Sequence, residues 1–218
     1  LKPLIRATIF RHFCGGETIG ECRHTIDQLD RGKVGAILDY SVEGEDEEEV
    51  FDETCEEIMR TIEGSRNDPR IPLTVFKVTG LGRASLIEKK DSGEQLTGPE
   101  AVEFEKIRYR VSRICSLAHQ LGVRVMIDAE ESWIQDSIDK LAMEMMRRYN
   151  QDKAIVYNTC QLYRNDKLDL LKEDTKTAAV EGFILGIKLV RGAYMEKERR
   201  RAAKRGYPSP VYQEKEQT

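Results

Sequence analysis

The chain has 218 residues, of which 39% are hydrophobic and 34% are charged. That length is sufficient for one domain with a substantial core, and no apolar run is long enough to span a membrane. The formal net charge of −4 argues against binding to bulk nucleic acid. We therefore expect a helix-rich globular protein without a nucleic-acid partner.

Short β-rich runs alternate with longer amphipathic stretches, after residues 1–32, which we expect to form a helical lead-in. The predicted strands are residues 34–40, 73–78, 123–128, 154–159 and 184–190. The predicted helices lie near residues 47–63, 100–120, 132–148, 165–181 and 195–205. Regular alternation of this kind is typical of parallel strands joined by right-handed crossovers.

Three segments are predicted to lie between these elements. Residues 65–72 contain Asn, Asp and two prolines, and residues 89–100 contain Asp, Ser and Gly, so both are expected to be loops. Within the second segment, Thr97 or Pro99 is expected to begin the next helix. The prolines of residues 207–210 are expected to end the last helix, because proline cannot continue it.

Two charged runs are interpreted as solvated surface. The acidic residues 43–49 are expected to lead into an acid-rich first helical turn, with metal binding as the weaker reading. The basic residues 197–205 are expected to form a solvated helix face, with contact to a membrane surface or a phosphate as the weaker reading.

Charged or polar residues follow each predicted strand, which is where α/β barrels place their chemistry. No G-x-G-x-x-G motif follows the first strand, so we favour a (βα)8 TIM-type barrel over a dinucleotide-binding Rossmann domain. A barrel needs eight strands, and the five predicted here would leave two edge strands unpaired. The chain also opens at Leu1 without an initiator Met and stops in a polar segment. We therefore expect residues 1–218 to be a C-terminally truncated piece of a longer barrel, supplying about five βα units.

Residues 186–198 form the most informative segment. Lys188 lies inside an apolar strand and Arg191 ends it, before Gly192 leads into a charged helical pattern. A cation in such a strand is costly unless an anionic or electron-rich group meets it. A strand, a cation, a glycine and a helix in this order are typical of a phosphate or cofactor site in a barrel.

Lys77 also has apolar neighbours on both sides of it in a predicted strand. At an inward position of a barrel strand it would meet a substrate carboxylate or form a Schiff base. The alternative is an edge lysine whose ammonium group reaches solvent. We favour the inward position.

Three further residues follow strands and are candidates for the site. Asp128 and Glu130 precede the next helix, so its dipole does not explain them, whereas it does explain Glu131 and Ser132. Gln161 follows the fourth strand, where its amide suits the edge of a heterocyclic ring. A loop amide that satisfies nearby backbone groups is an equal reading of Gln161.

No metal site is predicted. The five cysteines are scattered and form no C-x-x-C pair. Cys14 and Cys22, with His12 and His24 nearby, fit no zinc-binding spacing. Reduced thiols in a cytosolic compartment are the expected state.

Five segments together resemble the proline dehydrogenase family, flavoproteins that oxidise L-proline. The segments are DYSVEGE (39–45), FKVTGLGR (76–83), MIDAEESW (126–133), YNTCQLYR (157–164) and KLVRGAYMEKER (188–199). They occur in the family's order through nearly the whole chain, and they are more similar to the single-function enzymes than to the fused bifunctional ones. The resemblance implies a (βα)8 barrel with FAD over the C-terminal ends of its strands.

The resemblance also implies roles for individual residues. Lys77 would pair with the proline carboxylate, and Asp128 would be catalytic. Ala129 and Glu130 would lie beside the flavin, and Gln161 would hydrogen-bond its ring.

The resemblance implies further roles for residues of the fifth-strand and first-strand segments. Lys188 would lie near the reactive flavin nitrogen, where many members have arginine; lysine keeps the charge and lacks the planar fork. Tyr194 would lie close to the substrate, and Asp39 would support the site. Matches to the family's FAD contacts are Arg191, Gly192 and Ala193. The family's paired arginines on a late helix, its last three strands and a Thr-His pair that contacts FAD have no counterpart in this chain.

The expected reaction is FAD-dependent oxidation of L-proline, or hydroxyproline, to the 1-pyrroline-5-carboxylate product, with hydride transfer to flavin N5. Lys188 would stabilise the anionic reduced ring, Asp128 would orient that cation, and Lys77 would position the substrate. A quinone is the expected electron acceptor. The expected location is the cytoplasm, with peripheral membrane association as an alternative.

Two other functions stay open on the sequence alone. One is a lyase or aldolase barrel that uses Lys77 or Lys188 as a Schiff-base nucleophile. The other is a non-catalytic partial barrel that serves as an assembly or binding module and completes itself with a second chain.

Overall fold

A parallel sheet of five strands forms the centre of the fold, which a computed structural model describes for residues 15–16, 18–40, 44 and 46–218. The strands are β1 (Ile37–Asp39), β2 (Leu73–Phe76), β3 (Val125–Ile127), β4 (Val156–Gln161) and β5 (Ile187–Val190). Their order in the sheet is their order in the chain, and every neighbouring pair is parallel. The predicted α/β architecture is therefore confirmed.

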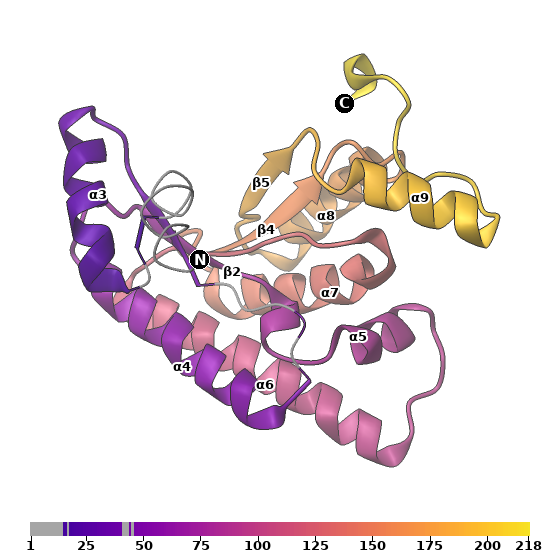
Figure 1. The fold of residues 1–218 in the computed structure, drawn as a ribbon, viewed down its shortest axis with the longest axis horizontal. Coiled ribbons are helices and arrows are strands. Elements are labelled where there is room, and N and C mark those ends of the chain that lie inside the picture. Colours follow the sequence, from indigo (N-terminus) through magenta and orange to yellow (C-terminus); the bar gives the residue numbers. More distant parts are fainter. Residues whose placement is uncertain (1–14, 17, 41–43, 45) are drawn as a thin grey trace, which may run out of the picture.

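Helices precede the first strand, connect successive strands as parallel pairing requires, and follow the last strand. They are α3 (Ile19–Arg31), α4 (Glu48–Ser65), α5 (Ala84–Asp91), α6 (Gly98–Leu121), α7 (Ser132–Tyr149), α8 (Lys167–Glu181) and α9 (Met195–Arg205), with short 3₁₀ helices η2 (Val78–Gly80) and η3 (Lys215–Gln217). Helices α4, α6 and α7 lie along one face of the sheet, and α9 lies beyond the end of β5 (Figure 1). The opposite face corresponds to the lumen of a barrel.

The hydrophobic core lies between the sheet and these helices. Phe76, Ile127 and Val156 point from the strands into one buried cluster, where they meet Ile114 of α6 and Ile138 of α7. Full burial of an apolar side chain of this size stabilises the fold by roughly 1.5–3 kcal/mol. Because side chains alternate along a strand, the residues next to these point to the lumen.

The strands β1, β2, β3 and β5 are shorter than predicted, and the two outer ones, β1 and β5, both begin late. Residues 34–40 and 184–190 were expected to be strands, whereas β1 begins at Ile37 and β5 begins at Ile187. Each of these strands pairs on one side only within the described sheet, so fewer ladder hydrogen bonds hold its ends.

Helix α5 was not predicted, and the loop expected over residues 89–100 is wrong in its first part. The helix has eight residues and buries Leu86 and Ile87, too few apolar positions for a clear 3.6-residue period. Helix α6, in contrast, begins where Thr97 predicted, with a capping box formed by Thr97 and Glu100.

The ends of other elements follow the sequence in part. Glu48 and Glu49 lie in the first turn of α4, as the acidic run predicted. Helix α9 ends at Gly206 in the left-handed conformation, before the prolines that were expected to end it. Residues 1–14 of the helical lead-in, and Ser41, lie outside the described residues.

Candidate active site

The strand register places four polar residues in one row on the lumen face. Thr159 and Lys188 are direct partners between β4 and β5. Phe76 and Ile127 are partners that point to the helices, so the residues that follow them, Lys77 and Asp128, stand level on the lumen side. Lys77, Asp128, Thr159 and Lys188 therefore line the carboxyl end of four neighbouring strands.

Asp128 is the anionic partner of Lys188. Its Oδ1 lies 2.5 Å from the Lys188 Nζ, and both side chains are about 30% exposed, at 28% and 32%. The same oxygen accepts a hydrogen bond of 3.1 Å from the Ala129 N–H and lies 3.3 Å from the Thr159 hydroxyl. The Asp128 carboxylate thus offsets the free-energy cost of placing the Lys188 ammonium group within an apolar strand.

Glu130 joins the loops that follow β2 and β3. Its carboxylate accepts a hydrogen bond of 3.1 Å from the Thr79 N–H and another from the Thr79 hydroxyl. Burial raises the pKa of Glu130 to about 7, while the bonds from Thr79 and the nearby Lys77 oppose the rise. This carboxyl group is therefore close to half protonated near neutral pH.

The backbone of Glu130 extends the same connection to β4. Its N–H donates to Gln135 Oε1 at 2.7 Å, and its carbonyl accepts from Gln161 Nε2 at 2.6 Å. Gln161 Nε2 also lies 2.8 Å from the Tyr163 hydroxyl. Gln161 Oε1 is buried and has no hydrogen-bond partner within the part of the chain that the structure describes.

Tyr194 precedes α9 and reaches the lumen residues. Burial raises its pKa, and a hydrogen bond with Lys77 and the charge of that lysine lower it, while Glu130 adds to the rise. Lys77, Glu130 and Tyr194 thus come together from the loops after β2, β3 and β5. The Lys77 side chain is half-buried, and its inward position stays the favoured prediction.

The remaining predicted residues lie around this centre. Arg191 is exposed and donates from Nε to the Thr218 carbonyl at 3.0 Å. Gly192 and Ala193 are also exposed, at the carboxyl end of β5. Asp39 pairs with Val75, so it stands one row nearer the amino ends of the strands, and it lines a hollow beside α4.

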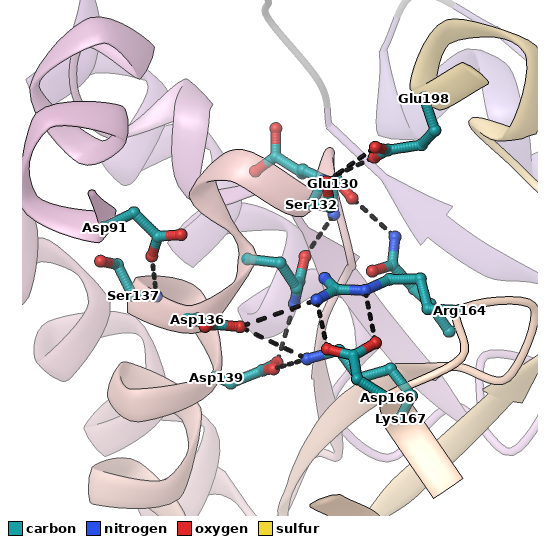
Figure 2. A network of polar contacts seen from close by, with 12 residues as sticks. Asp91, Glu130, Ser132, Asp136, Ser137, Asp139, Arg164, Asp166, Lys167 and Glu198 are labelled. Atoms are coloured by element: carbon teal, nitrogen blue, oxygen red, sulfur yellow. Dashed lines mark hydrogen bonds and ion pairs between the residues drawn. The ribbon is translucent and has the colours of Figure 1, made fainter. Parts of the chain in front are cut away.

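A buried polar cluster supports the loops from the helix side. Asp139 accepts from Gln135 and Asn158 at 2.8 Å each and from Lys167 Nζ at 2.6 Å. Figure 2 shows Asp139 and Lys167 of this cluster beside Arg164, which forms a two-point contact with Asp166 at 3.1 and 2.7 Å. The chain of contacts from Lys167 through Asp139 and Gln135 reaches the Glu130 backbone.

Several of these residues were missed by sequence reasoning. Thr159 could have been predicted, because it lies two residues before Gln161 on β4 and its side chain therefore points to the same face of the sheet. Thr79, Gln135 and the Asp139 cluster could not have been, since their partners are brought to them only by the fold.

Neither a metal site nor a membrane span is found among the residues that the structure describes. Within the described ranges, no group of three or more His, Cys, Asp or Glu side chains could hold a metal ion. His12 and Cys14 lie outside those ranges. Among the helices that the structure describes, none is both long and apolar enough to cross a bilayer.

A charged row at the carboxyl ends of parallel strands, with helices on the opposite face, defines part of an α/β barrel with its chemistry at the strand ends. Comparison with known proteins identifies the kind of barrel. The proline dehydrogenase family model matches residues 22–218, and the chain belongs to that family. The resemblance seen in the sequence is thereby confirmed.

Individual relatives agree with this assignment. The chain is 38% identical over 188 residues to the carbapenem antibiotics biosynthesis protein CarD of Pectobacterium carotovorum subsp. carotovorum, covering 86% of this chain and 50% of the relative. It is 31% identical over 252 aligned positions to proline dehydrogenase 1, mitochondrial, of Dictyostelium discoideum, covering 96% and 44%. The chain thus spans about half the length of these curated relatives.

A solved structure confirms the fold. Proline utilization A (PutA) from Bdellovibrio bacteriovorus, inactivated by N-propargylglycine, matches with a TM-score of 0.80 and 20% sequence identity, over 95% of this chain and 22% of that one. At that identity the likeness concerns the fold alone. The TIM-type barrel prediction is confirmed, with five of its strands present here.

Proposed function

We propose that the protein containing this chain is an FAD-dependent proline dehydrogenase that oxidises L-proline to 1-pyrroline-5-carboxylate. Family membership supports this proposal, and one observation in the structure carries it. Two lysines from β2 and β5 face one lumen, with a carboxylate between them that pairs with one and leaves the other toward Tyr194. A small amino acid and a flavin need this combination of charges.

The residues present fit a flavin. Gln161 Oε1 is a buried acceptor with no donor among the described residues, and such an oxygen costs free energy until a donor meets it. An N–H on the edge of a flavin ring is a suitable donor. Ala129 and Glu130 flank this position, and Arg191, Gly192 and Ala193 would contact the rest of the cofactor at the end of β5. When bound, FAD supplies the hydride acceptor, at N5.

Each lumen side chain has a distinct task in this proposal. Lys77 binds the proline carboxylate and fixes the orientation of the ring, helped by Tyr194. Lys188 places a positive charge where negative charge develops in the reaction, and Asp128 holds that ammonium group in position. Asp39 supports the site from the neighbouring row.

A Schiff-base mechanism through Lys188 is disfavoured by its contact with Asp128. A Schiff-base nucleophile must reach a carbonyl carbon, and the Lys188 Nζ is engaged by the Asp128 carboxylate at 2.5 Å. Hydroxyproline as an alternative substrate, a quinone as the electron acceptor, and a cytoplasmic location stay predictions.

Purified full-length protein tests the proposal. We expect flavin absorbance that bleaches when L-proline is added without oxygen and returns when a soluble quinone is added. Lys77→Met should raise KM for proline at least tenfold, because the carboxylate loses its cation. Lys176→Met, at an exposed position of α8, is the matched control and should leave KM unchanged. Protein that binds no flavin, or bleaching that ignores the loss of Lys77, would contradict the proposal.

A further inference from the structure

Glu198 is a charged side chain with 0% exposure in the first turn of α9. A buried carboxylate is costly unless hydrogen bonds satisfy both of its oxygens. Here the Ser132 N–H donates to one oxygen at 2.6 Å and the Ser132 hydroxyl donates to the other at 2.7 Å. Figure 2 shows Glu198 reaching across to Ser132.

The contact serves as an N-terminal cap supplied from another helix. Glu131, the N-cap residue of α7, forms no capping hydrogen bond with its own side chain. Glu198 takes this place from 66 residues away, at the end of α7 where the helix dipole favours a negative charge.

Neighbouring residues extend the contact on both sides. Lys197 pairs with Glu131, and the Arg201 guanidinium lies 4.0 Å from the centre of the Trp133 ring. Three consecutive residues at the start of α7 therefore each contact α9. These contacts also occupy part of the basic run that was expected to be a solvated face.

The two segments joined in this way carry the proposed site. Helix α7 begins directly after Asp128 and Glu130, and α9 begins directly after Arg191 and Tyr194. A fixed contact between the two helix starts therefore fixes the β5–α9 loop against the β3–α7 loop.

We propose that Glu198 is a positioning residue that holds the β5–α9 loop, residues 191–194, in place for substrate and cofactor binding. This rests on the proposed function of the site. The residue touches no reacting group itself, since its carboxylate is fully engaged by Ser132. Its effect should therefore appear in binding more than in the chemical step.

The test compares Glu198→Ala, Glu198→Gln and Ser132→Ala in the full-length protein. We expect Glu198→Ala to raise KM for proline about tenfold with a smaller change in kcat, and to weaken FAD retention during gel filtration. Glu198→Gln keeps one acceptor oxygen and should recover part of the loss. Ser132→Ala removes only the hydroxyl and should fall between wild type and Glu198→Ala.

The matched control is Glu196→Gln, because Glu196 lies in the same helix and is exposed. Hydrogen exchange provides a readout that needs no activity: amides of residues 191–198 and 131–134 should exchange faster in Glu198→Gln and at the wild-type rate in Glu196→Gln. If Glu198→Ala fails to fold, Glu198→Gln and Ser132→Ala still test the positioning role of Glu198.

Unchanged exchange and unchanged KM in Glu198→Gln and Ser132→Ala would overturn the positioning role. A uniform loss of Tm without a change in KM would also overturn it, because that result indicates a merely structural residue. If the wild-type protein lacks proline oxidation but the exchange result holds, the proposed function fails while the loop contact stands.

Discussion

The two faces of the sheet differ in what their side chains do. On the helix face, Phe76, Val125 and Ile127 are buried among apolar neighbours. On the lumen face, the adjacent positions Lys77 and Asp128 are partly exposed and charged. Neighbouring residues of one strand thus serve different purposes. A substitution on the helix face should mainly lower stability, and a substitution on the lumen face should mainly lower activity.

The largest expected effect falls on the lumen face. Lys188→Met removes the cation beside the proposed flavin and leaves Asp128 without its partner. We expect proline oxidation by the full-length protein to fall by about 100- to 1000-fold, which corresponds to about 3–4 kcal/mol of barrier. Steady-state kinetics with a dye acceptor would measure it, with Tm changed little.

Two variants sharpen this prediction. Lys188→Arg keeps the charge and should recover most of the rate, since many family members have arginine there. Lys172→Met breaks an exposed ion pair with Asp169 on α8 and should leave the rate unchanged. A Lys188→Met protein with a wild-type rate would remove the lysine from the mechanism.

The next effect falls on the helix layer. Ile138→Ala empties space in the core where α7 packs against β4, and we expect the free energy of unfolding to drop by about 3 kcal/mol. Urea denaturation measures the drop, and KM of the surviving folded protein should match the wild type. Val180→Ala, at an 86% exposed position, should change stability by less than about 0.5 kcal/mol. Equal losses in both variants would contradict the assigned core.

The layer structure explains which features could be predicted from the sequence. Period-two alternation and the position of charges after strands are local, and parallel pairing brings strand ends to one edge. The sequence therefore predicts Lys77, Asp128 and Lys188 at the same edge of the sheet.

Other features depend on contacts that no local pattern encodes. Glu198 meets Ser132 and Glu130 meets Thr79 across 66 and 51 residues, at angles fixed only by packing. In the sequence Glu198 looks like an ordinary helix acid, and Glu130 is a site candidate whose bonds to Thr79 no local pattern shows. Helix α5 was missed because its two buried residues are too few to show a period.

The raised pKa of Glu130 leads us to expect that the stability of the fold depends on pH. Its pKa rises from 4.5 to about 7 on folding because of burial. The stability it contributes is thus fully present below its unfolded pKa and is lost as pH rises through about 7, by roughly 3 kcal/mol in total. Glu130→Gln fixes a neutral side chain, so its free energy of unfolding should fall less between pH 5 and pH 8 than that of the wild type.

The comparison must be made as a difference between the two proteins, because burial also raises the pKa of Asp91 and Asp174. Urea titrations at each pH give that difference. Glu53→Gln, at an exposed position of α4, should retain the wild-type slope. An identical slope in Glu130→Gln would show that Glu130 ionises in the folded protein as it does in the unfolded chain.

The smallest effect concerns the start of α6, far from the lumen. The Thr97 hydroxyl accepts a hydrogen bond from the Glu100 N–H, and the Thr97 N–H donates to the Glu100 carboxylate at 2.8 Å. Thr97→Ala removes the hydroxyl, and with it both the bond from the Glu100 N–H and the bond that the hydroxyl donates to the Glu100 carboxylate at 2.9 Å, so we expect a loss of about 1 kcal/mol in unfolding free energy. Thr97→Ser keeps the hydroxyl and should be close to neutral. Both variants should retain wild-type KM for proline; a change in KM with Thr97→Ala would mean that the helix layer and the lumen are coupled more tightly than the alternation of side chains implies.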